Sequence, residues 1–97
     1  MAKLTTEAVQ AQLEKLSGWS LKGEAIGKQY TWPSFPEAMK FVNQVADVAE
    51  QADHHPDILI NYRRVTLTLS THSEGGISQK DFDLAERIEK ELSKQAG

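Results

Sequence analysis

The sequence carries two hydrophobic periods, one typical of helices and one typical of strands. Residues 5–16 are the first stretch with the helical period. Apolar side chains recur there at i, i+4 and i+7 on one face: Val9, Leu13 and Leu16. Thr5 or Thr6 is a candidate N-cap, and Gly18 lies where a helix often ends in a left-handed turn. We therefore predict a first helix over residues 5–16.

Two further stretches have the helical period. Pro36 opens the longer one, with Ser34 as a candidate cap, and this helix must end before Pro56 because a residue preceding proline avoids the helical region. Its apolar stripe is Ala38, Phe41, Val42, Val45, Val48, Ala49 and Ala52. The last helix begins near Ser78, which forms a motif like a capping box with Asp81. Its inner face is Phe82, Ala85, Ile88 and Leu92.

Between these helices lie stretches that alternate apolar and polar residues, as strands do. They are residues 19–21, 25–32, 58–62 and 65–71. Gly23 supplies a turn between the first two, Pro33 stops the second, and Lys28 interrupts its apolar face. Arg63-Arg64 is a short connection between the last two, which are rich in β-branched residues. We therefore predict two β-hairpins.

The predicted order is helix, hairpin, helix, hairpin, helix, which indicates the α+β fold class. We expect a four-stranded antiparallel sheet with three helices packed on one face. The other face either meets solvent or forms an interface. The chain has 97 residues, no internal repeat and no linker, so we predict a single domain over residues 1–97.

The composition narrows the functional classes. Hydrophobic residues make up 39% and charged residues 26%, unlike a disordered chain. The absence of cysteine excludes disulfides, thiolate zinc sites and a cysteine nucleophile. The net charge of -3, with Arg63-Arg64 as the one notable basic pair, argues against direct binding of nucleic acid. No apolar run suits a signal peptide or a membrane span, so we expect a cytoplasmic protein.

The candidate catalytic residues lie in the second half of the chain. The three histidines are His54, His55 and His72. The first two precede Pro56 at a helix-to-strand junction, Asp81 begins the last helix, and Glu50 lies one turn before His54. Histidine is both an acid and a base near neutral pH, so imidazoles around one pocket can donate and accept protons in one reaction.

Other interpretations of these residues remain open at this point. Asp81 has a complete structural explanation as a helix cap, Glu50 as part of a polar helix face, and the histidine pair as a solvated loop. The histidines with Asp81 or Glu50 are also candidate ligands for zinc or iron. No His-x-x-x-His pair exists and adjacent histidines are an awkward chelate, so we predict no metal site.

A five-element pattern connects these residues to a known family. Its elements are Glu50, the run His54-His55-Pro56 that follows after three intervening residues, Tyr62, His72 and Asp81. This pattern resembles the characteristic segment of the pterin-4a-carbinolamine dehydratase family, whose element order is also the one predicted above. One position departs from it: many members have tryptophan two residues after the proline, where this chain has Ile58.

The resemblance implies a cytoplasmic dehydratase that removes water from a 4a-hydroxytetrahydropterin, left behind by an aromatic amino acid hydroxylase. It implies that His55 and His72 share the proton donor and acceptor roles, that His54 positions the ring, and that Asp81 orients a histidine. The implied substrate-binding residues are Glu50, Pro56, Asp57 and Ile58. The pterin is the substrate, and no metal or other cofactor is expected.

The resemblance also bears on partners. It implies a homodimer or homotetramer and a functional link to an aromatic amino acid hydroxylase. The alternative function is non-catalytic, as an oligomeric dimerisation cofactor for a regulatory protein, because one fold can host several functions.

Overall fold

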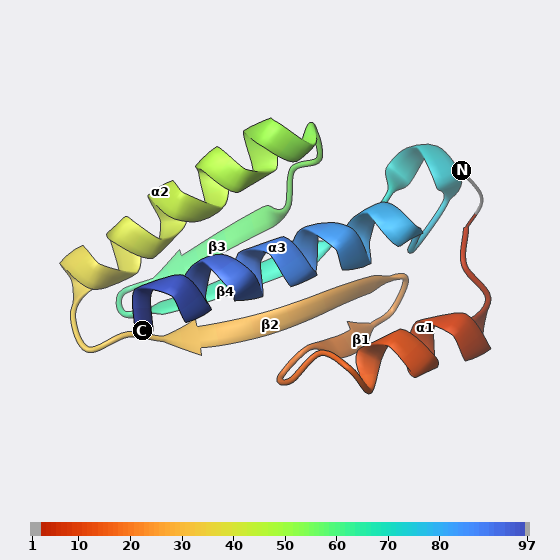
Figure 1. Cartoon of the computed structure of the whole chain (residues 1–97), viewed down its shortest axis with the longest axis horizontal. Coiled ribbons are helices and arrows are strands. Elements are labelled where there is room, and N and C mark those ends of the chain that lie inside the picture. Colours follow the sequence, from red (N-terminus) through yellow and green to blue (C-terminus); the bar gives the residue numbers. More distant parts are fainter. Residues whose placement is uncertain (1–2, 97) are drawn as a thin grey trace.

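The computed structural model describes residues 3–96, and its elements follow the predicted order (Figure 1). They are α1 Thr6–Leu13, β1 Ser20–Lys22, β2 Ala25–Thr31, α2 Phe35–Ala52, β3 Asp57–Asn61, β4 Arg64–Leu69, a 3₁₀ turn at His72–Glu74, and α3 Gln79–Ala96. The predicted α+β fold class is confirmed.

The strands form one antiparallel sheet in the order β1-β2-β4-β3. The register aligns Leu69 with Ile26 of β2, and Leu67 with Ile58 of β3. Because side chains alternate between the two faces of a strand, these apolar residues share one face. In Figure 1, α3 runs across this sheet with α2 on one side of it and α1 on the other.

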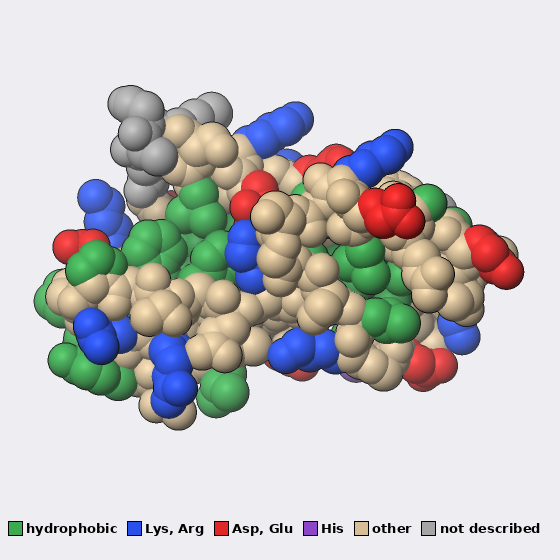
Figure 2. Space-filling view, turned by 90° about the horizontal axis from the view of Figure 1, so that it is seen from below, with side chains coloured by type: hydrophobic (Ala, Val, Ile, Leu, Met, Phe, Trp, Pro, Cys, Tyr) green, Lys and Arg blue, Asp and Glu red, His purple; other side chains and the backbone are tan. Residues whose placement is uncertain are grey.

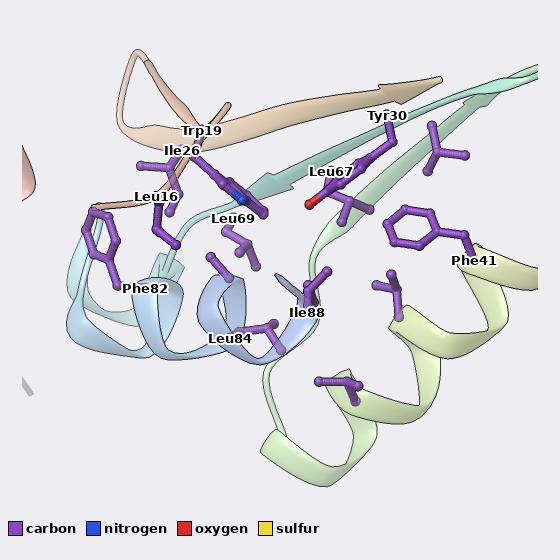
Figure 3. Close-up of a cluster of buried hydrophobic side chains, with 14 of the residues drawn as sticks. Leu16, Trp19, Ile26, Tyr30, Phe41, Leu67, Leu69, Phe82, Leu84 and Ile88 are labelled. Atoms are coloured by element: carbon purple, nitrogen blue, oxygen red, sulfur yellow. The ribbon is translucent and has the colours of Figure 1, made fainter. Parts of the chain in front are cut away.

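The hydrophobic core lies between that face and the helices (Figure 3). Every helix contributes to one cluster: Val9 from α1, Phe41 and Val45 from α2, and Phe82 and Ile88 from α3. The strands add Ile26, Tyr30, Val65, Leu67 and Leu69. The opposite face of the central strands carries polar residues instead, among them Gln29, Thr31, Thr66 and Thr68. The prediction that the helices pack on one face is therefore confirmed.

Local hydrogen bonds explain where the helices begin and end. The side chain of Thr5 accepts a bond from the N–H of Ala8, and Ser34 accepts one from Glu37, so both predicted caps are confirmed. Helix α2 ends at Ala52, and its C-cap, Asp53, has a φ of 52° in the left-handed region. This reversal directs the next residue, His54, away from the helix axis.

Several predicted boundaries differ from the structure by one to three residues, and local pairing explains two of these differences. Helix α1 ends at Leu13, since the N–H groups of Lys15 and Leu16 bond to carbonyls three residues back and tighten the chain into turns. The second hairpin turns at Tyr62 and Arg63, because Asn61 already pairs with Arg64. The predicted connection was one residue too late.

The surface of the described chain is mixed in charge. In Figure 2, hydrophobic side chains gather toward one end of the face in view, and acidic and basic side chains are scattered over the rest. The large hydrophobic side chains with substantial exposure are Leu21, Phe35, Leu59, Ile60 and Tyr62. Within residues 3–96, no helix has both the length and the apolar character needed to cross a bilayer.

Candidate active site

The end of α2 meets two segments that come some twenty or more residues later, toward one end of the molecule (Figure 1). These two segments are the 3₁₀ turn after β4 and the first turn of α3. The hydrogen bonds of Asp81 connect all three: its carboxylate contacts His54, Thr71 and Ser78. The fold therefore brings together predicted site residues that lie 27 positions apart in the chain, His54 and Asp81.

Asp81 is completely buried, with 0% of its surface exposed. One oxygen, Oδ2, accepts hydrogen bonds from the hydroxyl of Thr71 at 2.9 Å and from the backbone N–H of Ser78 at 3.0 Å. The other, Oδ1, lies 2.5 Å from Nε2 of His54. A buried carboxylate is tolerated only when such partners replace its hydration. These bonds explain why this position accepts an acidic residue.

The contact with Asp81 determines the protonation pattern of His54. When Asp81 is ionised, its carboxylate only accepts hydrogen bonds, and Nε2 of His54 then carries the hydrogen. In the neutral ring, Nδ1 then keeps a free lone pair. The side chain is 14% exposed, which leaves it largely enclosed but within reach of solvent. His54 is thus an oriented imidazole with one nitrogen committed to Asp81.

His55 has a different environment. Its Nε2 lies 2.5 Å from Oε2 of Glu50 in the last turn of α2. Both side chains are open to solvent, with 56% and 76% of their surfaces exposed. A solvated imidazole next to a carboxylate exchanges protons easily, and the carboxylate orients the ring. The structure therefore pairs each of the two adjacent histidines with its own acidic residue.

His72 lies in the exposed 3₁₀ turn that follows β4. It lines an open hollow of about 350 Å³ together with Asp57, Thr68 and Ser70. No hydrogen bond within residues 3–96 joins His72 to His54 or His55. The structure thus groups His72 with Asp57, the first residue of β3.

The remaining predicted residues follow the histidine pair. Pro56 is half-buried, and its ring restricts the backbone between α2 and β3. Ile58 is also half-buried and packs against the hydrophobic core. It is not among the residues that line the hollow shared by Asp57 and His72. Ile58 therefore has a role in packing whatever its relation to a ligand.

Thr71 and Ser78 belong to this site although the sequence patterns did not single them out as functional. Thr71 is 4% exposed and Ser78 is completely buried, and their hydroxyl oxygens are 2.7 Å apart. A motif like a capping box marked Ser78, and its N–H does bond to the carboxylate of Asp81. Thr71 had one possible signal, its position next to His72.

A second polar cluster lies between α3 and β2. The carboxylate of Glu89 accepts hydrogen bonds from Trp19 at 3.1 Å, from Lys28 at 3.0 Å, and from the hydroxyl of Tyr30. Burial, followed by the neighbouring carboxylate, raises the pKa of Tyr30 well above its ordinary value, so its hydroxyl stays protonated. Burial also acts to raise the pKa of Glu89, but the three donors outweigh it and lower that pKa.

A metal centre requires several ligand side chains that converge on one point. Within the described part of the chain, no three His, Cys, Asp or Glu side chains cluster in a way that could hold an ion. His54 and His55 each face one carboxylate, and those carboxylates belong to different elements. The arrangement is instead one of imidazole–carboxylate pairs, which is suited to proton transfer.

Comparison with known proteins assigns the chain to a family. A family model described as pterin 4 alpha carbinolamine dehydratase matches residues 2–91. A relative from Roseiflexus castenholzii, a pterin-4-alpha-carbinolamine dehydratase by name, is 51% identical over 90 residues, which are 92% of this chain and 97% of that protein. One from Sulfurisphaera tokodaii, with the same name, is 42% identical over 93 residues, or 96% of this chain and all of that protein.

A solved structure is similar over nearly the same length. It is a transcriptional coactivator/pterin dehydratase from Brucella melitensis, with a TM-score of 0.85 and 37% sequence identity. The match covers 91% of this chain and 96% of that one.

Proposed function

Since this chain belongs to the pterin-4a-carbinolamine dehydratase family, we propose that it removes water from a 4a-hydroxytetrahydropterin to give the quinonoid dihydropterin. A general acid protonates the hydroxyl oxygen on C4a while the C–O bond breaks. The lone pair of the adjacent N5 forms the new C–N double bond, and a base takes the N5 proton. The products are the dihydropterin and one water molecule, so no electrons are gained or lost.

The observation that carries this proposal is the pair of imidazole–carboxylate contacts: His54 with Asp81, which suits a ring that positions the pterin, and His55 with Glu50, which suits a proton-transfer group. Dehydration needs one group that gives a proton and another that takes one near neutral pH, and histidine does both. A carboxylate holds each ring in one orientation, as in other acid–base sites. The two histidines are adjacent in sequence, at the junction that Pro56 rigidifies.

We assign different roles to the three histidines. His54 is largely buried and fixed by Asp81, which suits a ring that positions the pterin. His55 and His72 are exposed, which suits groups that exchange protons with water between turnovers. They therefore share the donor and acceptor roles at C4a and N5. We propose that Glu50, Pro56, Asp57 and Ile58 complete the binding site around them.

The test is a dehydration assay on a chemically generated 4a-carbinolamine. We expect His55→Ala and His72→Ala each to lower turnover by about 10²–10⁴-fold, the contribution of a well-placed acid or base. Asn43→Ala, on the exposed surface of α2, is the control and should retain full turnover. Wild-type turnover in both histidine variants would contradict the assignment.

We also propose that the protein acts in the cytoplasm as a homodimer or homotetramer, linked to an aromatic amino acid hydroxylase that generates its substrate. The alternative is a non-catalytic dimerisation cofactor for a regulatory protein, which uses the same fold for binding alone. The assay separates the two, because a pure binding protein leaves the carbinolamine to dehydrate at its uncatalysed rate.

A further inference from the structure

The hydroxyl of Thr71 faces away from the turn that this residue begins. Thr71 is the N-cap of the 3₁₀ turn His72–Glu74, where a threonine hydroxyl commonly accepts a bond from the N–H groups of the turn. No such bond forms here. The hydroxyl instead donates to Asp81 at 2.9 Å and lies 2.7 Å from the hydroxyl of Ser78. Its one hydrogen goes to Asp81, so Ser78 is the donor in the second bond.

The backbone of Thr71 meanwhile closes the loop that carries His72. Its N–H bonds to the carbonyl of Gly76 at 2.8 Å, and its carbonyl accepts a bond from Glu74 at 3.0 Å. Thr71 is 4% exposed, so contacts within the protein determine the orientation of its side chain. One buried residue therefore holds the His72 turn through its backbone and Asp81 through its side chain.

We propose that Thr71 is a positioning residue of the dehydratase site, an inference that rests on the function proposed above. A carboxylate rotates readily about the bond that joins it to its side chain. The hydroxyl of Thr71 and the N–H of Ser78 both bond to Oδ2 of Asp81, which fixes this rotation. Oδ1 then faces His54 and keeps the hydrogen of the ring on Nε2. Thr71 thus controls the tautomer and orientation of His54.

A series of substitutions separates the hydroxyl from the shape of the side chain. Thr71→Val keeps the volume of the side chain and removes the hydroxyl. Thr71→Ser keeps the hydroxyl and removes the methyl group, and Thr71→Cys offers a weaker donor. The control is Thr66→Val, on the polar face of β4. Each variant is measured for kcat and KM with the 4a-carbinolamine, and for the ¹⁵N chemical shifts of the His54 ring.

If the hydroxyl positions Asp81, kcat is highest in Thr71→Ser, lower in Thr71→Cys and lowest in Thr71→Val. We expect Thr71→Val to lose about 10- to 100-fold in kcat, as for other supporting hydrogen bonds, with a smaller change in KM. In Thr71→Val, the ¹⁵N chemical shifts of the His54 ring should move away from those of the pure Nε2–H tautomer, while the ring shifts of His55 stay unchanged. We expect Thr71→Ser to have the kcat and the His54 ring shifts of the wild-type protein. The control Thr66→Val should match the wild-type protein in kcat, KM and ring shifts.

A packing role predicts the opposite order, with Val best and Ser worst, and that order overturns the proposal. If Thr71→Val does not fold, the kcat values of Thr71→Ser and Thr71→Cys still separate the two roles. The hydroxyl role requires Thr71→Ser to be the more active variant, and the packing role requires the opposite. If the wild-type protein has no turnover, the proposed function fails by itself. The ring shifts then still test Thr71, since an unchanged His54 tautomer in Thr71→Val or Thr71→Cys contradicts its role.

Discussion

Asp81 uses its two carboxylate oxygens for two tasks. Oδ2 accepts from Ser78 and Thr71 at the start of α3, and Oδ1 contacts His54. An amide at this position would offer one acceptor and one donor group. If its oxygen stays with Ser78 and Thr71, its NH₂ group faces Nε2 of His54 and moves the ring hydrogen to Nδ1. The two tasks therefore require a carboxylate.

From this geometry we predict that Asp81→Asn inverts the tautomer of His54. Turnover of the 4a-carbinolamine should fall by about 10²-fold, because the ring that positions the pterin is then held in the wrong tautomer. Stability to urea should fall by about 1–3 kcal/mol, because hydrogen bonds to a charged acceptor are stronger than those to a neutral amide. Asp83→Asn, at an exposed position of the same helix, is the matched control for both measurements. An Asp81→Asn variant with full turnover would show that the His54 tautomer has no part in catalysis.

The sequence alone identified both tasks of Asp81 but treated them as competing explanations. A helix cap and a site residue were alternatives because spacing says nothing about which oxygen meets which partner. Thr71 was missed for a related reason: it lies ten positions from Asp81 along the chain, and only the approach of the end of β4 to the start of α3 brings the two together. Predicting such contacts needs the tertiary fold.

At the scale of elements, the cluster around Glu89 anchors α3 to the sheet. The alternation of β2 places Lys28 on the core-facing side between Ile26 and Tyr30, where a charge needs a partner. Glu89 is that partner at 3.0 Å, and Lys28 also donates to the carbonyl of Ser17 at 3.0 Å. From the sequence Lys28 was only an interruption of the apolar face, since the partner lies 61 positions away.

We predict that Glu89→Gln destabilises the protein by about 1–3 kcal/mol near neutral pH, because hydrogen bonds to a charged acceptor are stronger than those to an amide. The folded pKa of Glu89 lies below its ordinary value of 4.5. The contribution of the carboxylate is therefore fully present above that value and is lost as the pH falls through the folded pKa. The difference in the free energy of unfolding between the wild-type protein and Glu89→Gln should therefore shrink as the pH falls.

The measurement is urea unfolding of both proteins at about pH 7 and at about pH 3.5. Glu86→Gln, exposed on the same helix, is the control and should leave stability nearly unchanged. A difference between Glu89→Gln and wild type that is equally large at both pH values would mean that the charge of Glu89 contributes nothing.

Element boundaries were predicted less well than element order, and the reasons are local. The apolar spacing of Val9, Leu13 and Leu16 is compatible with one long helix. In the structure Leu16 reaches the core from a turn instead, since the chain must bend to bring Trp19 next to α3. Periodicity records which side chains are buried, but a turn and a helix can bury the same residues.

At the scale of the whole molecule, the edge of the sheet formed by β3 is a candidate surface for self-association. Strand β3 pairs only with β4, so one side of its backbone has no strand partner within the described chain. It also carries exposed apolar side chains: Leu59 is 63% exposed and Ile60 is 38% exposed. An unprotected edge of this kind tends to pair with another chain. The self-association proposed above therefore has a specific candidate surface.

The prediction is that two copies join through β3 in an isologous, antiparallel contact. Leu59→Lys should shift the protein toward the monomer in sedimentation velocity, because a lysine on an edge strand opposes pairing. Leu21→Lys is the matched control: Leu21 is 45% exposed on the opposite edge strand, β1, which has only three residues. It should leave the oligomer intact. If the wild-type protein is an oligomer and Leu59→Lys sediments at the same rate, β3 is excluded as the interface. If the wild-type protein is a monomer, the proposal of self-association is contradicted.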